Sequence, residues 1–248
     1  MMKQKLVVIY YHEVVESGRG FSYQKIEKDK FEQQMKYLQE HHYQTLLFED
    51  LGKPLPEKSI IVSFDDGFKS VYENAVPIME KYGIKANIYL PTNYVGNDDH
   101  FMTWDMVREL QQTGNFEFAA HTHNHVDIRT LDEENMRSEV KLSTELFQNE
   151  LEAEPSAFCM PYGTFDRKSI ALLKRNSSYK YILGSFYGKV AESQLQNRII
   201  PRIGISNEDS IGDFERKLLG KFNWKGPLQL VRLFVKSILG DRVKQYEY

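Results

Sequence analysis

Two short clusters of carboxylate and imidazole side chains in this sequence could carry out hydrolytic chemistry. Asp65 and Asp66 are adjacent in SFDDG, directly after the apolar run SIIVSF. Neighbouring carboxylates repel each other, and a bound cation relieves that repulsion. In HTHNH, His121 and His125 are four residues apart, a spacing that on one helical turn directs both imidazoles to the same side. One aspartate and two histidines form an open ligand set that leaves a position for water, so the two clusters together predict a metal site.

Each cluster also has a purely structural interpretation. Asp-Asp-Gly is a common solvated turn, and a single histidine is more often structural than a ligand. His123, two positions after His121, should point elsewhere and is the weaker ligand candidate. A third cluster, CMPYG, brackets Tyr162 between proline and glycine in a turn whose backbone N–H could face the site. A turn alone would also explain this third cluster.

The segments between these clusters alternate in character and predict the elements that position them. Short apolar runs, rich in β-branched and aromatic residues, predict strands at 6–11, 59–64, 86–90, 116–120, 156–160 and 198–205. Amphipathic spacing predicts helices at 28–41, 70–82, 103–113, 132–151 and 166–176. Such alternation indicates an α/β fold with a parallel sheet, either a barrel or an open sheet. The three clusters follow predicted strands, which is where α/β folds place their ligands.

Length and composition narrow the class of protein. The chain has 248 residues, of which 41% are hydrophobic and 27% charged, enough for one substantial core. A net charge of −3 offers no general attraction to nucleic acid. The single cysteine, Cys159, excludes an internal disulfide and a cysteine-built zinc site. No apolar run reaches the roughly 20 residues of a membrane span, and the first residues lack a signal-peptide pattern, so we expect a cytoplasmic protein.

The last 28 residues, 221–248, differ from the rest in charge. They hold six lysines or arginines against two acids, and LQLVRLFVKSIL (228–239) is apolar almost all round. Gln229, Arg232 and Lys236 would form one narrow polar stripe on a helix over these residues. We expect this helix either to pack on the main domain or to contact a partner or a membrane surface.

SFDDG, HTHNH and CMPYG, in this order, resemble the motifs of the polysaccharide deacetylase family, the NodB-homology carbohydrate esterases. That family's first motif is Thr/Ser-Phe-Asp-Asp-Gly and its second is His-Ser/Thr-x-x-His, and the resemblance spans roughly residues 5–205. It implies a distorted (β/α)7 barrel for a catalytic domain over residues 1–220, with 221–248 as a basic, apolar helical extension. It also implies an enzyme that removes N-acetyl groups from a sugar or polysaccharide.

Carried over position by position, the resemblance implies a role for each motif residue. Asp65 is the expected catalytic base, and Asp66, His121 and His125 are the expected ligands of a divalent metal. Zinc is the first choice for this ligand set, which also accepts cobalt, nickel or iron. The family's reaction implies attack of a metal-activated water on the acetamide carbon, with the backbone N–H of Tyr162 helping to hold the oxyanion.

The sequence departs from the family pattern at two places. Cys159 stands where the third motif usually has an arginine that orients the catalytic aspartate, and no histidine follows His125 to protonate the leaving amine. His12 in YYHEV is a candidate for that acid, because a subgroup resembling the poly-N-acetylglucosamine deacetylases carries a Tyr-His motif at the beginning of the chain. Arg202 in RIIPRIGI is a candidate for the missing arginine, since its side chain could reach Asp65 over the barrel mouth.

Several alternatives stay open at this point. His12 could be a packed strand-end histidine, Arg202 a surface arginine, and Trp104 either a sugar-groove or a core residue. The chain could also be a sugar-binding relative without catalysis, or a deformylase or deacetylase of a lipid-linked sugar. The identity of the sugar, the native metal and the oligomeric state do not follow from the sequence.

Overall fold

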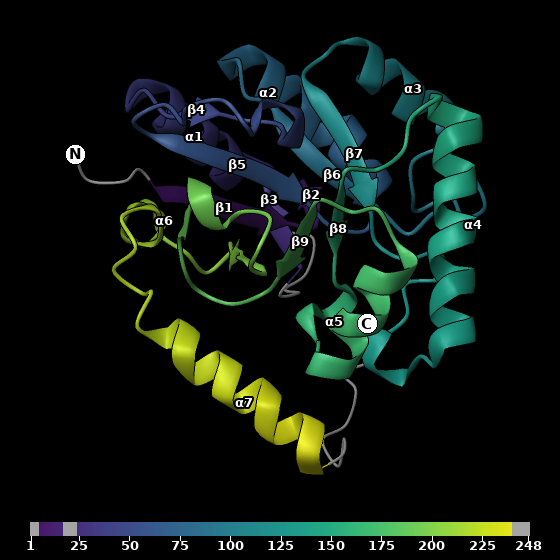
Figure 1. The fold of residues 1–248 in the computed structure, drawn as a ribbon. Helices are drawn as coiled ribbons and strands as arrows, with labels where there is room; N and C mark the ends of the chain where they lie inside the picture. The colour runs from purple at the N-terminus through teal and green to yellow at the C-terminus, as the bar shows by residue number, and fades with distance from the viewer. Residues whose placement is uncertain (1–4, 17–23, 240–248) are drawn as a thin grey trace.

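The computed structural model describes residues 5–16 and 24–239, and its frame is a parallel sheet that curls into a barrel with helices outside it (Figure 1). Six strands are hydrogen-bonded in sequence order: β1 (Lys5–Tyr11), β5 (Ser59–Phe64), β6 (Ala86–Leu90), β7 (Phe116–Ala120), β8 (Ala157–Cys159) and β9 (Tyr181–Gly184).

Two very short strands close the ring. β11 (Ile200–Pro201) pairs in parallel with β9, and β12 (Ile203–Gly204) pairs in parallel with β1. Counted as one interrupted strand, they complete seven parallel positions in the described residues, so the predicted distorted (β/α)7 barrel is confirmed.

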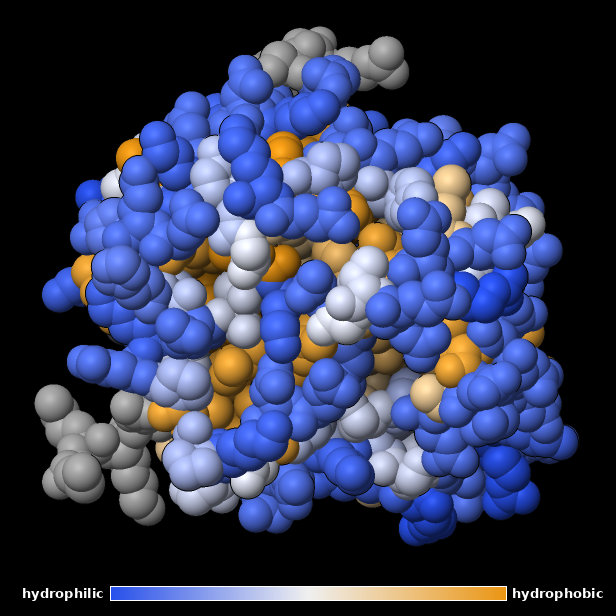
Figure 2. Space-filling view, turned by 90° about the horizontal axis from the view of Figure 1, so that it is seen from above, coloured by the Kyte–Doolittle hydropathy of each residue, from blue (hydrophilic) through white to orange (hydrophobic). Residues whose placement is uncertain are grey.

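The strands alternate between two apolar layers, as expected for strands covered on both faces. Leu6 and Val8 of β1 belong to an inner cluster that also takes residues from β5 to β9 and from β11. Val7 and Ile9 belong to an outer cluster that packs beneath the helices. All six residues of β5 are buried. Seen from above, the molecular surface consists mainly of hydrophilic residues, and hydrophobic residues show mostly in the gaps between them (Figure 2).

The predicted helices are present within a few residues of their expected bounds. They are α1 (Lys28–Glu40), α2 (Val76–Tyr82), α3 (Trp104–Gln112), α4 (Glu133–Leu151) and α5 (Arg167–Asn176). Side-chain caps explain where three of these helices begin. In each of them the side chain of the preceding residue accepts a hydrogen bond from a backbone N–H of the first turn. These residues are Thr103 for α3, Asp132 for α4 and Asp166 for α5.

The structure differs from two sequence predictions. The helix expected over 70–82 begins as a π-helical turn, Val71–Ala75, and continues as α2. Pro77 lies at this junction, and proline has no N–H for the usual helical hydrogen bond. The strand expected over 198–205 is interrupted at Arg202, which lies between β11 and β12.

Several elements were not predicted at all. They are β9, the helix α6 (Ile211–Leu218) and the short strands β2 (Glu13–Val15), β3 (Lys25–Glu27), β4 (Gln44–Thr45) and β10 (Val190–Ala191). β2 and β3 pair with each other, while β4 extends the sheet beside β5 and β10 beside β1. Strands of two to four residues are too short to show a periodic pattern.

The helix predicted at 228–239 is confirmed as α7 (Lys225–Leu239), which lies outside the barrel (Figure 1). It is fastened to the loop after β9, because Oε1 of Gln229 accepts a hydrogen bond from the Tyr187 backbone N–H at 2.8 Å. A Cβ on Gly226 would lie 2.0 Å from the Tyr187 carbonyl oxygen, so only glycine fits this close approach.

Some of the predicted extension falls outside the described residues, namely residues 240–248 and the side chain of Lys236. The division into domains at residue 220 therefore stays a prediction. Within 5–16 and 24–239, none of the helices combines the length and hydropathy that a bilayer span requires.

Candidate active site

The SFDDG turn at the end of β5 needs its glycine for two reasons. Asp66 has φ 70° and Gly67 has φ 66°, so two successive residues adopt the left-handed conformation. A Cβ on Gly67 would also lie 2.6 Å from Cδ2 of Leu90. This tight turn directs Asp65 and Asp66 to the barrel mouth, where their exposed fractions are only 5% and 7%.

The HTHNH segment at the end of β7 is not a helical turn, and that prediction was wrong. Thr122 has φ 61° and His125 has φ 53°, so the segment is an irregular loop. The loop still directs His121 and His125 to one place, with their ring centroids 4.8 Å apart. His123 points elsewhere, as predicted, and its Nδ1 lies 2.9 Å from Oγ1 of Thr92.

A buried glutamate, which the sequence analysis missed, holds this loop. Oε2 of Glu139 accepts hydrogen bonds from the backbone N–H groups of His123 and Asn124 at 2.8 and 2.9 Å. Glu139 lies on the buried side of α4 with Met136 and Val140. An acidic residue on the apolar stripe of a helix is unusual, and this feature of the sequence could have indicated a role for Glu139.

Asp66, His121 and His125 form a compact donor set. Oδ1 of Asp66 lies 3.3 Å from Nε2 of His121 and 3.1 Å from Nε2 of His125. All three donor atoms lie within 4.8 Å of one another. Burial alone would raise the pKa of Asp66, but the two imidazoles hold that pKa well below its ordinary value.

Two details indicate that this donor set fits a cation. Oδ1 of Asp66 is buried and makes no hydrogen bond within the described part of the chain. Nδ1 of His121 lies 2.8 Å from the Cys159 carbonyl oxygen, so it can donate its N–H there and leave the Nε2 lone pair facing Asp66. A backbone carbonyl commonly fixes a metal-binding histidine in this way.

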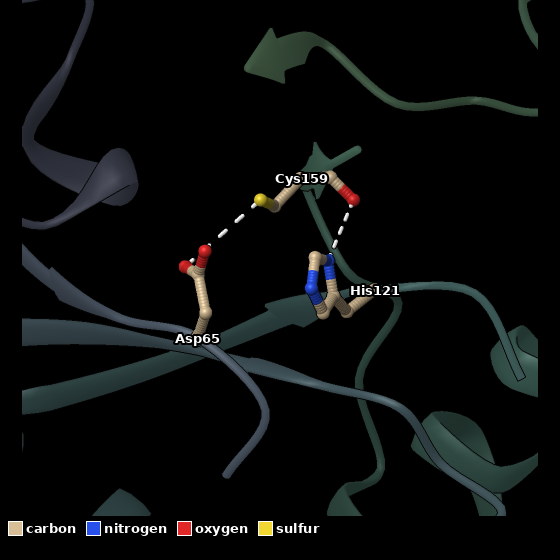
Figure 3. A group of neighbouring side chains, drawn as sticks. All are labelled: Asp65, His121 and Cys159. Atoms are coloured by element: carbon tan, nitrogen blue, oxygen red, sulfur yellow. Dashed lines mark hydrogen bonds between the residues drawn. The ribbon is translucent and has the colours of Figure 1, made fainter. Parts of the chain in front are cut away.

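A second group, Asp65, His121 and Cys159, is equally compact but suits a metal less well (Figure 3). The Cys159 thiol points toward Asp65, with Sγ 4.0 Å from Oδ1. Burial raises the pKa of the Cys159 thiol, and metals bind the thiolate form. The Asp65 carboxylate, moreover, already has a cationic partner.

That partner is Arg202, which enters from the break between β11 and β12. Its Nη1 donates to Oδ1 of Asp65 at 2.5 Å and its Nη2 to Oδ2 at 2.9 Å. The guanidinium lies over the rings of Tyr10 and Tyr89, 4.5 and 5.1 Å from their centroids. Burial would raise the pKa of Asp65, but the charge and hydrogen bonds of Arg202 outweigh it and keep that pKa below its ordinary value.

His12 and Tyr162 lie at the rim of the same site. Nε2 of His12 is 3.9 Å from Oδ2 of Asp65. Tyr162 has φ 58° and is 47% exposed, and its hydroxyl donates to the His125 carbonyl oxygen at 3.2 Å. All the site residues predicted from the sequence are therefore neighbours. Trp104 is not, because it is partly buried against the core, edge-on to the ring of Phe147.

One cavity of about 460 Å³ is lined by His12, Asp65, Asp66, His121, His125 and Tyr162, whereas Arg202 is not part of its lining. α7 adds two more side chains to its wall, Gln229 and Arg232. Both were predicted to lie on the polar stripe of this helix, but no role in the site was predicted for them. Two polar side chains in an otherwise apolar helix are the sequence feature that could have indicated this role.

Comparisons with known proteins show which family the chain belongs to. The model of the family described as polysaccharide deacetylase matches residues 52–181, just over half of the chain. The Bacillus subtilis (strain 168) protein YxkH is 29% identical over 172 residues, covering 67% of this chain and 60% of YxkH.

A second relative is the poly-beta-1,6-N-acetyl-D-glucosamine N-deacetylase of Escherichia coli (strain K12). It is 24% identical over 289 residues, covering 97% of this chain and 42% of the relative. The chain thus spans less than two thirds of the length of both these proteins.

Among solved structures, the fold is similar to that of a polysaccharide deacetylase from Bacillus cereus. The TM-score is 0.79 at 24% identity, and the match covers 88% of this chain and 70% of the other. On the family match over more than half its length, this chain belongs to the polysaccharide deacetylase family.

Proposed function

We propose that the protein is a metal-dependent hydrolase that removes N-acetyl groups from an acetamido sugar or polysaccharide. The observation that carries this proposal is the Asp66–His121–His125 donor set directly beside the paired carboxylate of Asp65. The family match and the activity named for the Escherichia coli relative support it.

Asp66, His121 and His125 would hold the cation, which when bound polarises a carbonyl group and lowers the pKa of water. Zinc is the first expectation for one carboxylate and two imidazoles, and cobalt, nickel or iron also suit this set.

Asp65 is the general base of the proposed reaction. Because Arg202 keeps its pKa low, the carboxylate is ionised at neutral pH and is ready to accept a proton from the attacking water. The paired guanidinium also fixes the carboxylate's orientation, since two parallel hydrogen bonds leave little rotational freedom. Arg202 therefore has the positioning role that the family's third-motif arginine would have had.

The reaction also requires an acid for the departing nitrogen. Water oxygen adds to the acetyl carbon, the carbon–nitrogen bond breaks, and the products are acetate and a free amine. An amine leaves poorly without a proton, and His12 at the cavity wall is the candidate donor. The backbone N–H of Tyr162 is the candidate hydrogen-bond donor to the oxyanion.

The main alternative is a relative that binds sugar without cleaving it. The proposal of catalysis is favoured because the base, the three cation donors and the positioning arginine are all present together. The deciding experiment measures acetate release from chitin oligomers and from poly-N-acetylglucosamine oligomers by metal-loaded protein. Binding of these oligomers without acetate release would favour the alternative.

A further inference from the structure

A second large cavity, of about 640 Å³, lies between α5 and α7. We call it the α5–α7 groove. Its apolar lining comes from the loop before α5, from α5 itself, from the residue before β11 and from α7: Phe165, Ile170, Ile199, Leu230, Leu233 and Phe234. Apolar surface of this extent in the lining of a cavity usually marks a binding site.

Cationic side chains border this groove. Arg167, Lys168 and Lys174 of α5 all line it, and within the described residues none of them forms an ion pair. One acid, Asp166, also lines the groove, but its carboxylate is engaged as the α5 cap and accepts a hydrogen bond from the Ser169 backbone N–H at 2.7 Å. An apolar floor with a cationic border is complementary to an amphiphile with an apolar chain and an anionic group.

α7 is the wall that the groove shares with the catalytic cavity. Gln229 and Arg232 line the catalytic cavity, while Leu230, Leu233 and Phe234 line the groove. Successive helical residues are about 100° apart around a helix that is roughly 10–12 Å wide with its side chains. The two cavities therefore lie on adjacent sides of the same two helical turns, a separation that one extended ligand can span.

We propose that the α5–α7 groove binds the lipid chain of the substrate, and that the substrate is an N-acetylated sugar joined through phosphate to a prenyl or alkyl chain. The sugar occupies the catalytic cavity, Arg232 binds the phosphate at the boundary, and the chain lies along Leu230, Leu233 and Phe234. This inference rests on the proposed function, because the reacting sugar uses the same catalytic cavity.

Arg232 suits the phosphate for reasons of position and charge. It is exposed, it lines the catalytic cavity, and no acid lies within residues 221–235 of its own segment. Among the described residues it forms no ion pair, whereas both terminal nitrogens of Arg202 already donate to Asp65. A guanidinium in this situation readily pairs with a phosphate.

The first test measures binding without catalysis. Decyl phosphate, used below its micelle-forming concentration, is titrated into the full chain by calorimetry. Phe234→Ser removes a groove side chain, and Val231→Ser is the matched control, because Val231 is equally exposed at 60% on the same helix but does not line the groove. We expect wild type and Val231→Ser to bind, and Phe234→Ser to bind at least about tenfold more weakly.

Equal binding by all three proteins, or no binding by any of them, would overturn the lipid-chain site. Size-exclusion chromatography of the same proteins adds another decisive outcome. If the wild type is a dimer that Phe234→Ser converts to a monomer, the groove is an interface between two copies of this chain and the proposal is wrong.

The second test measures acetate release from the methyl and decyl phosphodiesters of N-acetylglucosamine 1-phosphate. Each methylene group that is buried strengthens binding by about fourfold at most. We therefore expect kcat/KM for the decyl ester to exceed that for the methyl ester by more than about tenfold, because its chain is longer. This ratio should fall in Phe234→Ser and stay high in Val231→Ser. Arg232→Ala should raise KM for both esters more than for chitin oligomers, which lack the phosphate.

Failure of this inference and failure of the proposed function give different results. Equal kcat/KM for the two esters, with acetate released from both, would exclude the lipid-chain site and leave the deacetylase intact. No acetate from either ester or from chitin oligomers would contradict the deacetylase, and decyl phosphate binding would still decide the nature of the groove.

Discussion

Arg202 and Asp65, 137 residues apart in the sequence, form a two-pronged ion pair with Nη–Oδ distances of 2.5 and 2.9 Å. Arg202 lies in the break between the two short strands that close the barrel, and Asp65 lies at the end of β5. The contact that orients the proposed base is thus made by the same segment that closes the fold.

The first prediction concerns this ion pair. Arg202→Ala removes the main cation that keeps the pKa of Asp65 low, and only the smaller effects of His12 and His121 then oppose burial, so that pKa rises. Because Asp65 must be ionised to act as a base, the acidic limb of the kcat/KM–pH profile should move to higher pH and turnover should fall. Metal content should stay at the wild-type level.

The same substitution also leaves a buried carboxylate unpaired, which typically costs about 3–5 kcal/mol of folding free energy. Arg202→Lys is therefore measured in parallel, since it keeps a positive charge and should shift the limb less. Arg198→Ala, at an exposed position of the same segment, is the control. An unchanged acidic limb in folded Arg202→Ala would contradict the positioning role.

The second prediction separates the two adjacent carboxylates. Asp65→Asn should retain the metal but lower kcat by about 10²–10⁴-fold, because an amide cannot accept the proton. Turnover of acetylated oligomers and metal content are measured on the same preparation, with the exposed Asp105→Asn as the control. Loss of metal with retained turnover would mean that the roles of Asp65 and Asp66 are exchanged.

The third prediction concerns the glycine of the SFDDG turn. Gly67 and Gly83 have similar left-handed φ values of 66° and 64°, but only Gly67 has a neighbour, Leu90, where a Cβ would be. Gly83→Ala should cost about 1–2 kcal/mol from backbone strain alone. Gly67→Ala should cost about 1–3 kcal/mol more, because Leu90 must also move. Urea unfolding of both variants measures the difference, and equal losses would show that the contact with Leu90 is unimportant.

The fourth prediction concerns Glu139, which holds the histidine loop without touching the proposed cation site. Glu139→Ala leaves two backbone N–H groups without their acceptor, so the loop should lose its fixed geometry. Loss of such supporting contacts typically weakens metal affinity by 10–100-fold. Chelator competition measures the affinity, with Glu145→Ala on the exposed side of α4 as the control. If the two variants held metal equally well, Glu139 would have no positioning role.

Much of the barrel could be predicted from the sequence because its longer elements have regular patterns. The strands at 59–64, 86–90 and 116–120 have the predicted bounds, since each is a short run of mainly apolar residues. The motif residues could be grouped because parallel strands end at the same edge of the sheet. Arg202 could be connected with Asp65 only as a hypothesis, since its reach depends on how the barrel closes.

Other features depend on tertiary structure and have no local pattern. Four of the non-glycine residues with positive φ belong to the site, namely Asp66, Thr122, His125 and Tyr162. Such strained conformations persist only where surrounding contacts determine them, so the HTHNH loop was mistaken for a helical turn. The place of α7 beside the catalytic cavity depends on the close approach of Gly226 to Tyr187, which no periodicity indicates.

The most direct test of the account is the metal content of purified wild-type protein and of His125→Ala, measured together with acetate release from acetylated oligomers. His125 lies in a loop, so its loss should leave the thermal unfolding curve nearly unchanged. We expect about one equivalent of divalent metal per wild-type chain, and loss of both metal and acetate release in the variant. A folded His125→Ala protein with wild-type metal content and wild-type acetate release would contradict it.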